Sequence, residues 1–186
     1  MMKNKYQKKI WTIPNVLSMF RIGLIPVLVW MYVVVQDEFM TLCLLSLSGI
    51  TDIADGIIAR KFQMISDFGK VLDPVADKLT QTAMLVCLVI EYEIMLMPLV
   101  LLVIKEFCNA ITGFLSIKYT STVQGADWHG KLSTILLYIM VATHLVWIDI
   151  PEAVSVGLVG MCMMVMLMSL VLYSVRNVKS IMNKTF

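Results

Sequence analysis

Apolar residues dominate this chain and recur in blocks that are each long enough to cross a lipid bilayer as a helix. Six blocks can be marked, with short polar junctions between them: residues 14–35, 40–60, 68–90, 94–117, 125–147 and 151–175. A helix needs about 20 mostly apolar residues to cross the hydrocarbon core of a membrane. The pattern therefore predicts an all-α integral membrane protein with six transmembrane helices, and because no internal repeat is visible we expect one domain over residues 1–186.

The charges at the block ends predict how the helices are oriented. Junctions with acidic residues alternate with ends that carry lysine or arginine, so that the chain changes from basic to acidic ends with every crossing. The acidic junctions contain Asp37, Glu38, Glu91, Glu93, Asp149 and Glu152, and the basic ends contain Lys3, Lys5, Lys8, Lys9, Arg60, Lys61, Lys118, Arg176, Lys179 and Lys184. Cytoplasmic loops are enriched in lysine and arginine, so we expect both termini on the cytoplasmic side.

The basic segment before the first block has two interpretations. Residues 3–12 mix lysines with Tyr6, Ile10 and Trp11, a pattern typical of a short amphipathic helix that lies on an anionic membrane surface. A basic tail that obeys the positive-inside rule is the alternative. We expect no cleaved signal here, because no small-residue cleavage site follows.

Composition narrows the class of protein further. Hydrophobic residues make up 59% of the chain and the mean hydropathy is +0.84, which leaves too few polar residues to cover a soluble bundle. The net charge of +2 gives no indication of nucleic-acid binding. The four cysteines match no metal or redox spacing, and we expect them to be reduced packing residues.

Four aspartates are concentrated in the second and third blocks, where charge is costly and therefore indicates function. Asp52 and Asp55 are three residues apart, and Asp73 and Asp77 are four apart, so each pair shares one helix face. Both pairs fall near the cytoplasmic side, and a turn over residues 62–67 would bring the two faces together. Four carboxylates this close cannot all stay ionised in apolar surroundings, so either some carry protons or cations lie between them.

Oxygen ligands alone suit a hard cation such as Mg²⁺ or Mn²⁺. Two such ions would clamp a pyrophosphate and assist displacement at phosphorus, with Asp77 as the candidate general base. Small residues nearby allow close approach of a ligand, and one arginine offers a fork for a phosphate oxygen; these are Gly56, Ala59, Gly69 and Arg60. A divalent-cation transport site and a structural ion-pair cluster remain as alternatives.

The same stretch resembles the signature of the CDP-alcohol phosphotransferase family, D-x2-D-G-x2-A-R-x8-G-x3-D-x3-D. Every fixed position is filled, in order, by Asp52, Asp55, Gly56, Ala59, Arg60, Gly69, Asp73 and Asp77. The resemblance implies six membrane helices, cytoplasmic termini and a homodimer. It also implies two divalent ions per subunit, Mg²⁺ or Mn²⁺, held by the four aspartates, with Asp77 as base. Asp52, Gly56, Ala59, Arg60 and Gly69 would bind CDP-diacylglycerol, and CMP would be released.

The opening of the first block is similar to that of the bacterial phosphatidylglycerophosphate synthases and their cardiolipin synthase relatives. The matching run is Ile-Pro-Asn-Val-Leu-Ser from Ile13, followed by Arg21. The similarity implies that Asn15 and Arg21 lie near the donor. The alternatives are that Asn15 caps the first helix and that Arg21 reaches out to the interface.

The acceptor is indicated less directly. Lys105 and Lys131 resemble positions that meet the phosphate of glycerol 3-phosphate in those synthases, and His129 is a further candidate for acceptor binding. A structural Lys105–Glu106 pair and a simple polar contact of His129 are the alternatives. The sequence departs from the synthases at Gly113, where they carry a second arginine.

We therefore expect glycerol 3-phosphate as acceptor, with phosphatidylglycerol, and so cardiolipin synthesis, as the close alternative. A bacterial plasma membrane is the expected location.

Overall fold

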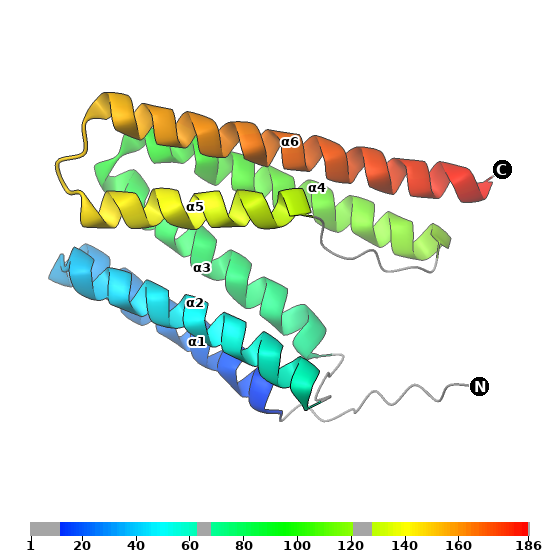
Figure 1. Cartoon of the computed structure of the whole chain (residues 1–186), viewed down its shortest axis with the longest axis horizontal. Coiled ribbons are helices and arrows are strands. Elements are labelled where there is room, and N and C mark those ends of the chain that lie inside the picture. The colour runs from blue at the N-terminus through cyan, green and yellow to red at the C-terminus, as the bar shows by residue number, and fades with distance from the viewer. Residues whose placement is uncertain (1–11, 63–67, 121–127, 186) are drawn as a thin grey trace. The chain divides into compact units, whose positions relative to one another are not determined.

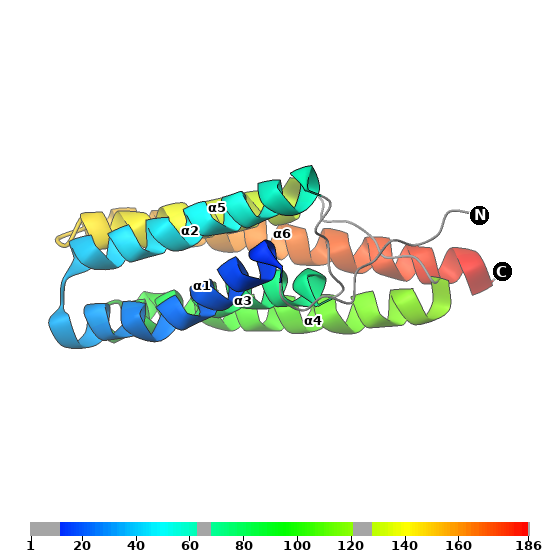
Figure 2. The same ribbon diagram turned by 90° about the horizontal axis from the view of Figure 1, so that it is seen from below.

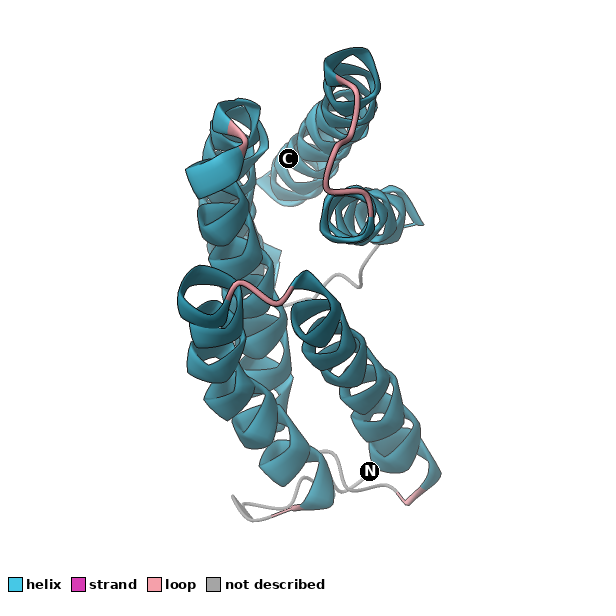
Figure 3. Cartoon of the chain, turned by 90° about the vertical axis from the view of Figure 1, so that its left-hand side faces the viewer, coloured by secondary structure: helices cyan, strands magenta, loops and turns pink. Residues whose placement is uncertain are grey.

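The computed structural model describes residues 12–62, 68–120 and 128–185. Within these ranges all regular structure is helical (Figure 3), which confirms the all-α prediction. The elements are α1 (Ile13–Trp30), η1 (Met31–Val35), α2 (Glu38–Lys61), α3 (Gly69–Glu91), η2 (Glu93–Met95), α4 (Leu96–Thr120), α5 (Trp128–Val146) and α6 (Glu152–Thr185). The amphipathic N-terminal helix and most of the turn between the aspartate pairs lie outside the described residues.

Each of the six predicted blocks corresponds to one long helix, and five of them are long and apolar enough to cross a membrane. These five spans are Ile13–Val35, Glu38–Ala59, Glu93–Gly113, Trp128–Val146 and Glu152–Lys179. The remaining helix is α3, which carries Asp73, Asp77 and Lys78 among its apolar residues. The chain thus has the helices of a multi-pass membrane protein.

The chain forms two compact units, residues 1–87 and residues 88–186, and the boundary falls inside α3. In the first unit α1 packs along α2 (Figure 1). Thr12 caps α1, since its side chain accepts a hydrogen bond from the backbone N–H of Asn15 at 3.5 Å. Asn15 itself lies in the first turn and is buried, so the alternative that Asn15 caps this helix is wrong.

The connection from α1 to α2 is short and tightly defined. The last turn of α1 widens into the π-helical turn η1, and Gln36 follows in the left-handed conformation with a φ of 57°. Asp37 then caps α2, because its carboxylate accepts a hydrogen bond from the N–H of Met40 at 2.8 Å. These contacts satisfy backbone groups that would otherwise be unpaired at the helix ends.

In the second unit α6 packs along both α4 and α5 (Figures 1 and 2). Near the α5–α6 connection, His144 is buried and fully bonded, with Nδ1 at 2.8 Å from the Met140 carbonyl and Nε2 at 2.9 Å from Ser155 Oγ. Tyr92 donates to the Ile148 carbonyl at 3.0 Å and packs its ring edge-on against His144. This network ties η2, α5 and α6 together at one end of the unit.

Large apolar side chains remain exposed along every long helix, among them Trp30, Phe39, Ile90, Phe107, Trp128 and Met164. A soluble monomer rarely exposes apolar surface on this scale. In a bilayer the same side chains face lipid tails, which are as apolar as the side chains themselves. The exposure agrees with the membrane character predicted from composition.

Two glycines on different helices provide a test of the packing of the second unit. A Cβ added to Gly130 of α5 would lie 2.6 Å from the Tyr173 hydroxyl of α6, whereas one added to Gly113 of α4 would meet nothing within 4 Å. We expect Gly130→Ala to lower Tm by a few degrees, because overpacking costs roughly 1–3 kcal/mol. Gly113→Ala should leave Tm unchanged or raise it, since alanine is the better helix former by roughly 0.5–1 kcal/mol. Thermal unfolding in detergent measures both, and an equal effect of the two changes would contradict this packing.

Candidate functional site

Arg21 joins two of the four aspartates of the signature. It lies in the middle of α1 with its side chain 2% exposed, and its guanidinium pairs through Nη1 with Asp52 and through Nη2 with Asp55 Oδ2 at 2.5 Å. The two carboxylates are one helical turn apart on α2, so a planar fork can reach both at once. Arg21 therefore does not reach out to the membrane interface, which was the alternative interpretation of the sequence.

Ser18, one turn before Arg21 on α1, brings in a third aspartate. Its hydroxyl contacts Asp73 of α3, lies 3.5 Å from Asp55 Oδ2 and is bonded to the Pro14 carbonyl at 3.0 Å. A hydroxyl carries one proton and can donate it to only one of these three oxygens. Full pairing of this group therefore needs either a proton on a carboxyl group or a cation among the oxygens.

The charges of this cluster do not balance. Asp52, Asp55 and Asp73 contribute three negative charges when ionised and Arg21 contributes one positive charge, which leaves −2 for these four side chains. Asp55 has only 3% of its side chain exposed, whereas 47% of the Asp52 side chain is exposed. A buried excess of negative charge is costly, and a divalent cation is the simplest group that would offset it.

The donor set fits such a cation, because carboxylate and hydroxyl oxygens are the ligands of Mg²⁺ and Mn²⁺. Among the described residues, however, no three or more His, Cys, Asp or Glu side chains already stand in a metal-ligating arrangement. Arg21 and Ser18 instead contact the carboxylate oxygens that face them. A metal bound here would have to share those oxygens with Arg21.

Asp77 lies one turn beyond Asp73 on α3 and is held by its own helix. Its Oδ2 accepts a hydrogen bond from Gln81 Nε2 at 2.9 Å and lies 3.8 Å from Lys78 Nζ. The Gln81 side chain is buried and fixed, so it orients the Asp77 carboxylate. Of the Asp77 side chain, 24% is exposed, which leaves it open to another molecule.

The other signature residues lie at helix ends. Gly56 and Ala59 are partly buried in the last turns of α2, and Gly69 is buried at the start of α3. Arg60 belongs to α2, but its side chain is outside the described part of the structure. These positions flank the carboxylates in sequence, and their role in CDP binding stays a prediction.

A second polar cluster lies in the other unit and contains the candidate acceptor residues. Lys105 of α4 is 4% exposed, and its Nζ lies 3.1 Å from Ser133 Oγ of α5 and 3.5 Å from Glu106. Ser133 donates its own proton to the Gly130 carbonyl at 2.8 Å, so its oxygen is free to accept from the ammonium group. The Lys105–Glu106 pair expected as an alternative is thus present, and Ser133 adds to it.

His129 is buried beside the same helices. Its Nδ1 lies 3.2 Å from Ser169 Oγ, and its ring meets Tyr173 edge-on with 4.6 Å between the centroids. The guanidinium of Arg176 lies over the Tyr173 ring, 4.8 Å from the ring centroid. The polar contact expected of His129 as an alternative is therefore present.

Lys131 is exposed, two positions from both His129 and Ser133, which are buried. Residues two apart on a helix do not face the same way. Lys131 therefore lies on the other side of α5 from the Lys105 contact, and a joint role of the two lysines stays a prediction.

Comparison with known proteins shows which family this chain is similar to. The model of a family described as CDP-alcohol phosphatidyltransferase matches residues 11–177, nearly the whole chain. The chain belongs to this family. The resemblance drawn from the eight signature residues is thereby confirmed.

The similar curated proteins of this family fall into two groups by name. A human protein named cardiolipin synthase (CMP-forming) is 38% identical over 111 residues, which cover 59% of this chain and 36% of that protein. A CDP-diacylglycerol–glycerol-3-phosphate 3-phosphatidyltransferase of Rickettsia bellii is 35% identical over 97 residues, or 51% of this chain and 54% of that protein. A Streptomyces coelicolor cardiolipin synthase (CMP-forming) is 40% identical over 78 residues, or 38% of this chain and 35% of that protein. The matches thus span between about a third and about half of these relatives.

The structure adds residues to each of the two candidate clusters that the sequence interpretation missed. They are Ser18 and Gln81 around the aspartates and Ser133, Ser169, Tyr173 and Arg176 in the second cluster. Ser18 could have been found, because Asn15, Ser18 and Arg21 recur every three residues and so form a polar stripe in an apolar block. The others depend on contacts between helices, which the sequence pattern does not contain.

The position of Arg21 generates a stability prediction. Arg21→Gln should lower the free energy of unfolding by roughly 3–5 kcal/mol in the presence of EDTA, because it leaves the buried Asp55 carboxylate without its cation. Thermal unfolding of the purified protein measures this change. Lys61→Gln is the matched control, since Lys61 is exposed at the end of α2, and it should leave Tm within about 1 °C. A Tm of Arg21→Gln equal to that of the control would show that the pairing does not stabilise the fold.

Proposed function

We propose that this protein transfers a phosphatidyl group from CDP-diacylglycerol to an alcohol acceptor and releases CMP, with two divalent ions bound at the aspartates. The observation that carries the proposal is the convergence of Asp52, Asp55 and Asp73 on Ser18 and Arg21. The three aspartates are signature residues from α2 and α3. Together with Ser18 and Arg21 they form a partly buried, negatively charged cluster. Asp77, one turn from Asp73, is the fourth ligand in this proposal.

The ions would supply positive charge that offsets the charge of the donor's pyrophosphate and of the carboxylates. Arg21 contributes a further donor, because its Nε is buried without a hydrogen-bond partner among the described residues. A buried N–H without a partner is costly, and a phosphate oxygen of the donor would satisfy it. This supports the prediction that Arg21 lies near the donor.

Asp77 is the proposed general base. It takes the proton from the acceptor hydroxyl, whose oxygen then attacks the phosphorus atom that carries the diacylglycerol group. A new P–O bond forms to the acceptor, the P–O bond to CMP breaks, and CMP leaves with the electron pair. Gln81 fixes the orientation of the Asp77 carboxylate by the hydrogen bond of 2.9 Å.

Glycerol 3-phosphate is the proposed acceptor, because Lys105 provides a buried cation that a phosphate would pair with. Phosphatidylglycerol is the second candidate. A side chain at Gly113 would meet nothing within 4 Å, so α4 has open space for a larger acceptor at this position. The relatives include proteins named for each of these two syntheses.

The proposal also covers the number of membrane spans and the side of the membrane on which the aspartates lie. We propose that α3 is the sixth span, because Asp73 and Asp77 belong to the site and Lys78 lies 3.8 Å from Asp77. The basic block ends then lie on the cytoplasmic side of a bacterial plasma membrane, together with both termini and the aspartates. The family resemblance implies a homodimer, which belongs to this proposal.

The acceptor can be decided by one assay. Purified protein in detergent is supplied with CDP-diacylglycerol and Mg²⁺, and CMP release is followed with glycerol 3-phosphate or with phosphatidylglycerol as acceptor. We expect release with glycerol 3-phosphate, and we expect Lys105→Gln to raise its KM about tenfold by removing a charge-assisted contact. Release with phosphatidylglycerol alone would assign cardiolipin synthesis, and release with neither would reject both acceptors.

Asp77→Asn tests the proposed base. Asparagine keeps the shape of the side chain and the contact with Gln81 but cannot take a proton, so kcat should fall by roughly a hundredfold to ten-thousandfold. Binding of the donor, measured by isothermal titration, should remain. Asp37→Asn is the matched control, because asparagine still caps α2 and Asp37 lies at the end of α2 away from Asp52 and Asp55. A kcat of Asp77→Asn within about twofold of the control's would exclude Asp77 as the base.

A further inference from the structure

Two helices of the second unit continue past the point where α5 begins. His129, in the first turn of α5, contacts Ser169 and Tyr173 of α6, so α5 begins level with these two residues. Beyond this level α4 and α6 run on side by side (Figures 1 and 2). Their paired ends, residues 112–120 and 177–185, form the α4–α6 extension.

The two helices of the extension are joined by a buried polar contact. Asn177 is 5% exposed, and its Nδ2 donates to Thr112 Oγ1 at 2.9 Å. The Thr112 hydroxyl donates in turn to the Cys108 carbonyl at 2.8 Å. If one helix slid along the other, Asn177 would lose its partner, which is costly for a buried group. The extension therefore projects as one pair of helices rather than as two separate tails.

The length of α6 places the extension outside the hydrocarbon core of a membrane. Its 34 residues span about 51 Å, whereas the core is about 30 Å thick. The stretch from Glu152, at the start of α6, to Tyr173 already covers about 32 Å. Trp128, the first residue of α5, lies at the same level and is 68% exposed, which is typical of aromatic side chains at the membrane interface. The extension thus lies in the headgroup layer and beyond it.

The charges at this end of the second unit are almost all positive. Residues 107–148 and 153–186 contain five bases and a single acid, Asp127. The bases, which together form what we name the basic end, are Lys118, Lys131, Arg176, Lys179 and Lys184. Bases without neighbouring acids attract anions over about one Debye length.

The basic end lies at the depth of lipid headgroups. Arg176 and Lys179 are three and six residues beyond Tyr173, which corresponds to about 4.5 Å and about 9 Å along a helix. The headgroup layer on each side of the core is about 5–8 Å thick. Lys131 and Lys179 are exposed, so their ammonium groups can reach this layer.

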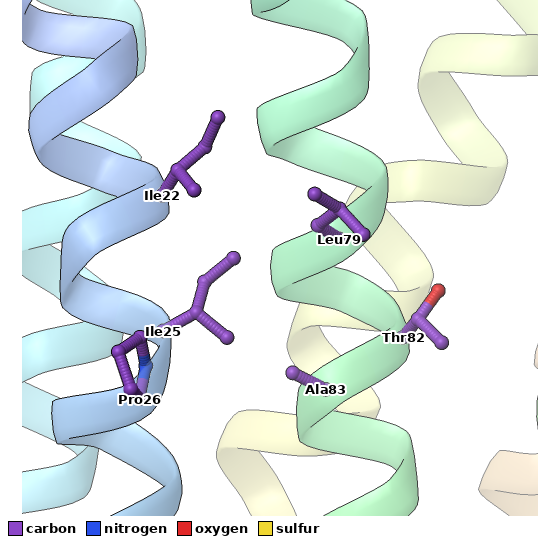
Figure 4. A pocket seen from close by; sticks show the side chains of 6 residues that line it. All are labelled: Ile22, Ile25, Pro26, Leu79, Thr82 and Ala83. Atoms are coloured by element: carbon purple, nitrogen blue, oxygen red, sulfur yellow. The ribbon is translucent and has the colours of Figure 1, made fainter.

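The helix ends around the aspartates differ from the basic end. Residues 52–78 of the first unit contain four bases and five acids, so an anionic headgroup would meet negative charge there as well. A hollow of about 360 Å³ between α1 and α3 presents no charged side chain (Figure 4). Its lining consists of Ile22, Ile25, Pro26, Leu79, Thr82 and Ala83.

We propose that the basic end binds the headgroups of anionic lipids in the surrounding leaflet. Each lysine or arginine close to an anionic surface favours binding by roughly fivefold. Trp128 and Val178, which is 49% exposed, add apolar contacts at a similar depth. In the orientation proposed above this leaflet is the cytoplasmic one, which carries the anionic lipids. The inference goes beyond the proposed reaction, because anionic lipid is enriched beside the second unit whether or not substrate is turned over.

Photo-labelling locates the bound lipid without requiring turnover. The full chain in phosphatidylcholine nanodiscs receives a trace of phosphatidylserine or of phosphatidylcholine, each with a diazirine close to the glycerol, and labelled peptides are mapped by mass spectrometry. Phosphatidylserine is anionic but is neither donor nor acceptor in the proposed reaction. We expect it to label residues 170–185 roughly fivefold more than phosphatidylcholine does. About 0.5 M NaCl should reduce this excess to less than about twofold, because salt screens exposed charges.

Charge variants test whether the lysines cause the excess. Changing Lys179 and Lys184 together to glutamine should lower it at least about twofold, whereas changing both to arginine should preserve it because the charges remain. Lys61→Gln is the matched control, since Lys61 is an exposed base at the end of α2. It should leave the labelling of residues 170–185 unchanged.

Four outcomes would overturn the proposal. They are equal labelling of the unmodified protein by the two lipids, equal losses in the glutamine and arginine variants, a loss in Lys61→Gln as large as in the glutamine variant, and no labelling of residues 170–185 by either lipid. The third would show a general effect of basic helix ends, and the fourth would show that protein covers this surface. None of them bears on the proposed function, which CMP release tests separately.

Discussion

The pairing of Arg21 with Asp52 and Asp55 is the interaction on which the candidate site depends. It sets a buried cation from α1 against two acids of α2, of which Asp55 is buried as well. Neither Arg21 nor Asp55 could remain charged there without its partner. Ser18, on the same face of α1, extends the contact to Asp73 of α3. Three helices are therefore joined at one level by polar groups, although almost everything around them is apolar.

Much of the fold could be predicted because its dominant signal is length. Blocks of about 20 apolar residues have one common solution in a bilayer, and the observed helices begin and end within a few residues of the predicted blocks, except that α6 continues to Thr185, ten residues beyond the last block. The signal weakened for α3, where Asp73, Asp77 and Lys78 interrupt the apolar run. The widening of the last turn of α1 and the left-handed Gln36 were not predicted either, since no glycine or asparagine indicates a turn there.

The candidate site likewise has residues that could be predicted from the sequence and residues that could not. The aspartates could be predicted from the sequence, because their spacing on helices is local and their cost in a membrane indicates a function. Their partners could not, because the contact of Gln81 with Asp77 or of Ser133 with Lys105 depends on side-chain directions within and between helices. Asn15 shows the opposite error: its residue type favours a cap, but Thr12, three residues earlier, already fills that position. Lys131 is exposed whereas Ser133 is buried, and which side of α5 each residue occupies could not be predicted from the sequence.

Pro26 gives α1 an uneven stiffness. A proline inside a helix leaves the carbonyl four residues earlier, here that of Ile22, without its usual hydrogen bond, and helices bend most easily at such a point. Ser18 and Arg21 lie on the N-terminal side of this joint, whereas Ile25 and Pro26 lie at it. The part of α1 after Pro26 can therefore tilt while the part that holds the carboxylates stays still. A helix that bends at Pro26 can adjust its second half to its surroundings without disturbing the polar cluster that its first half holds.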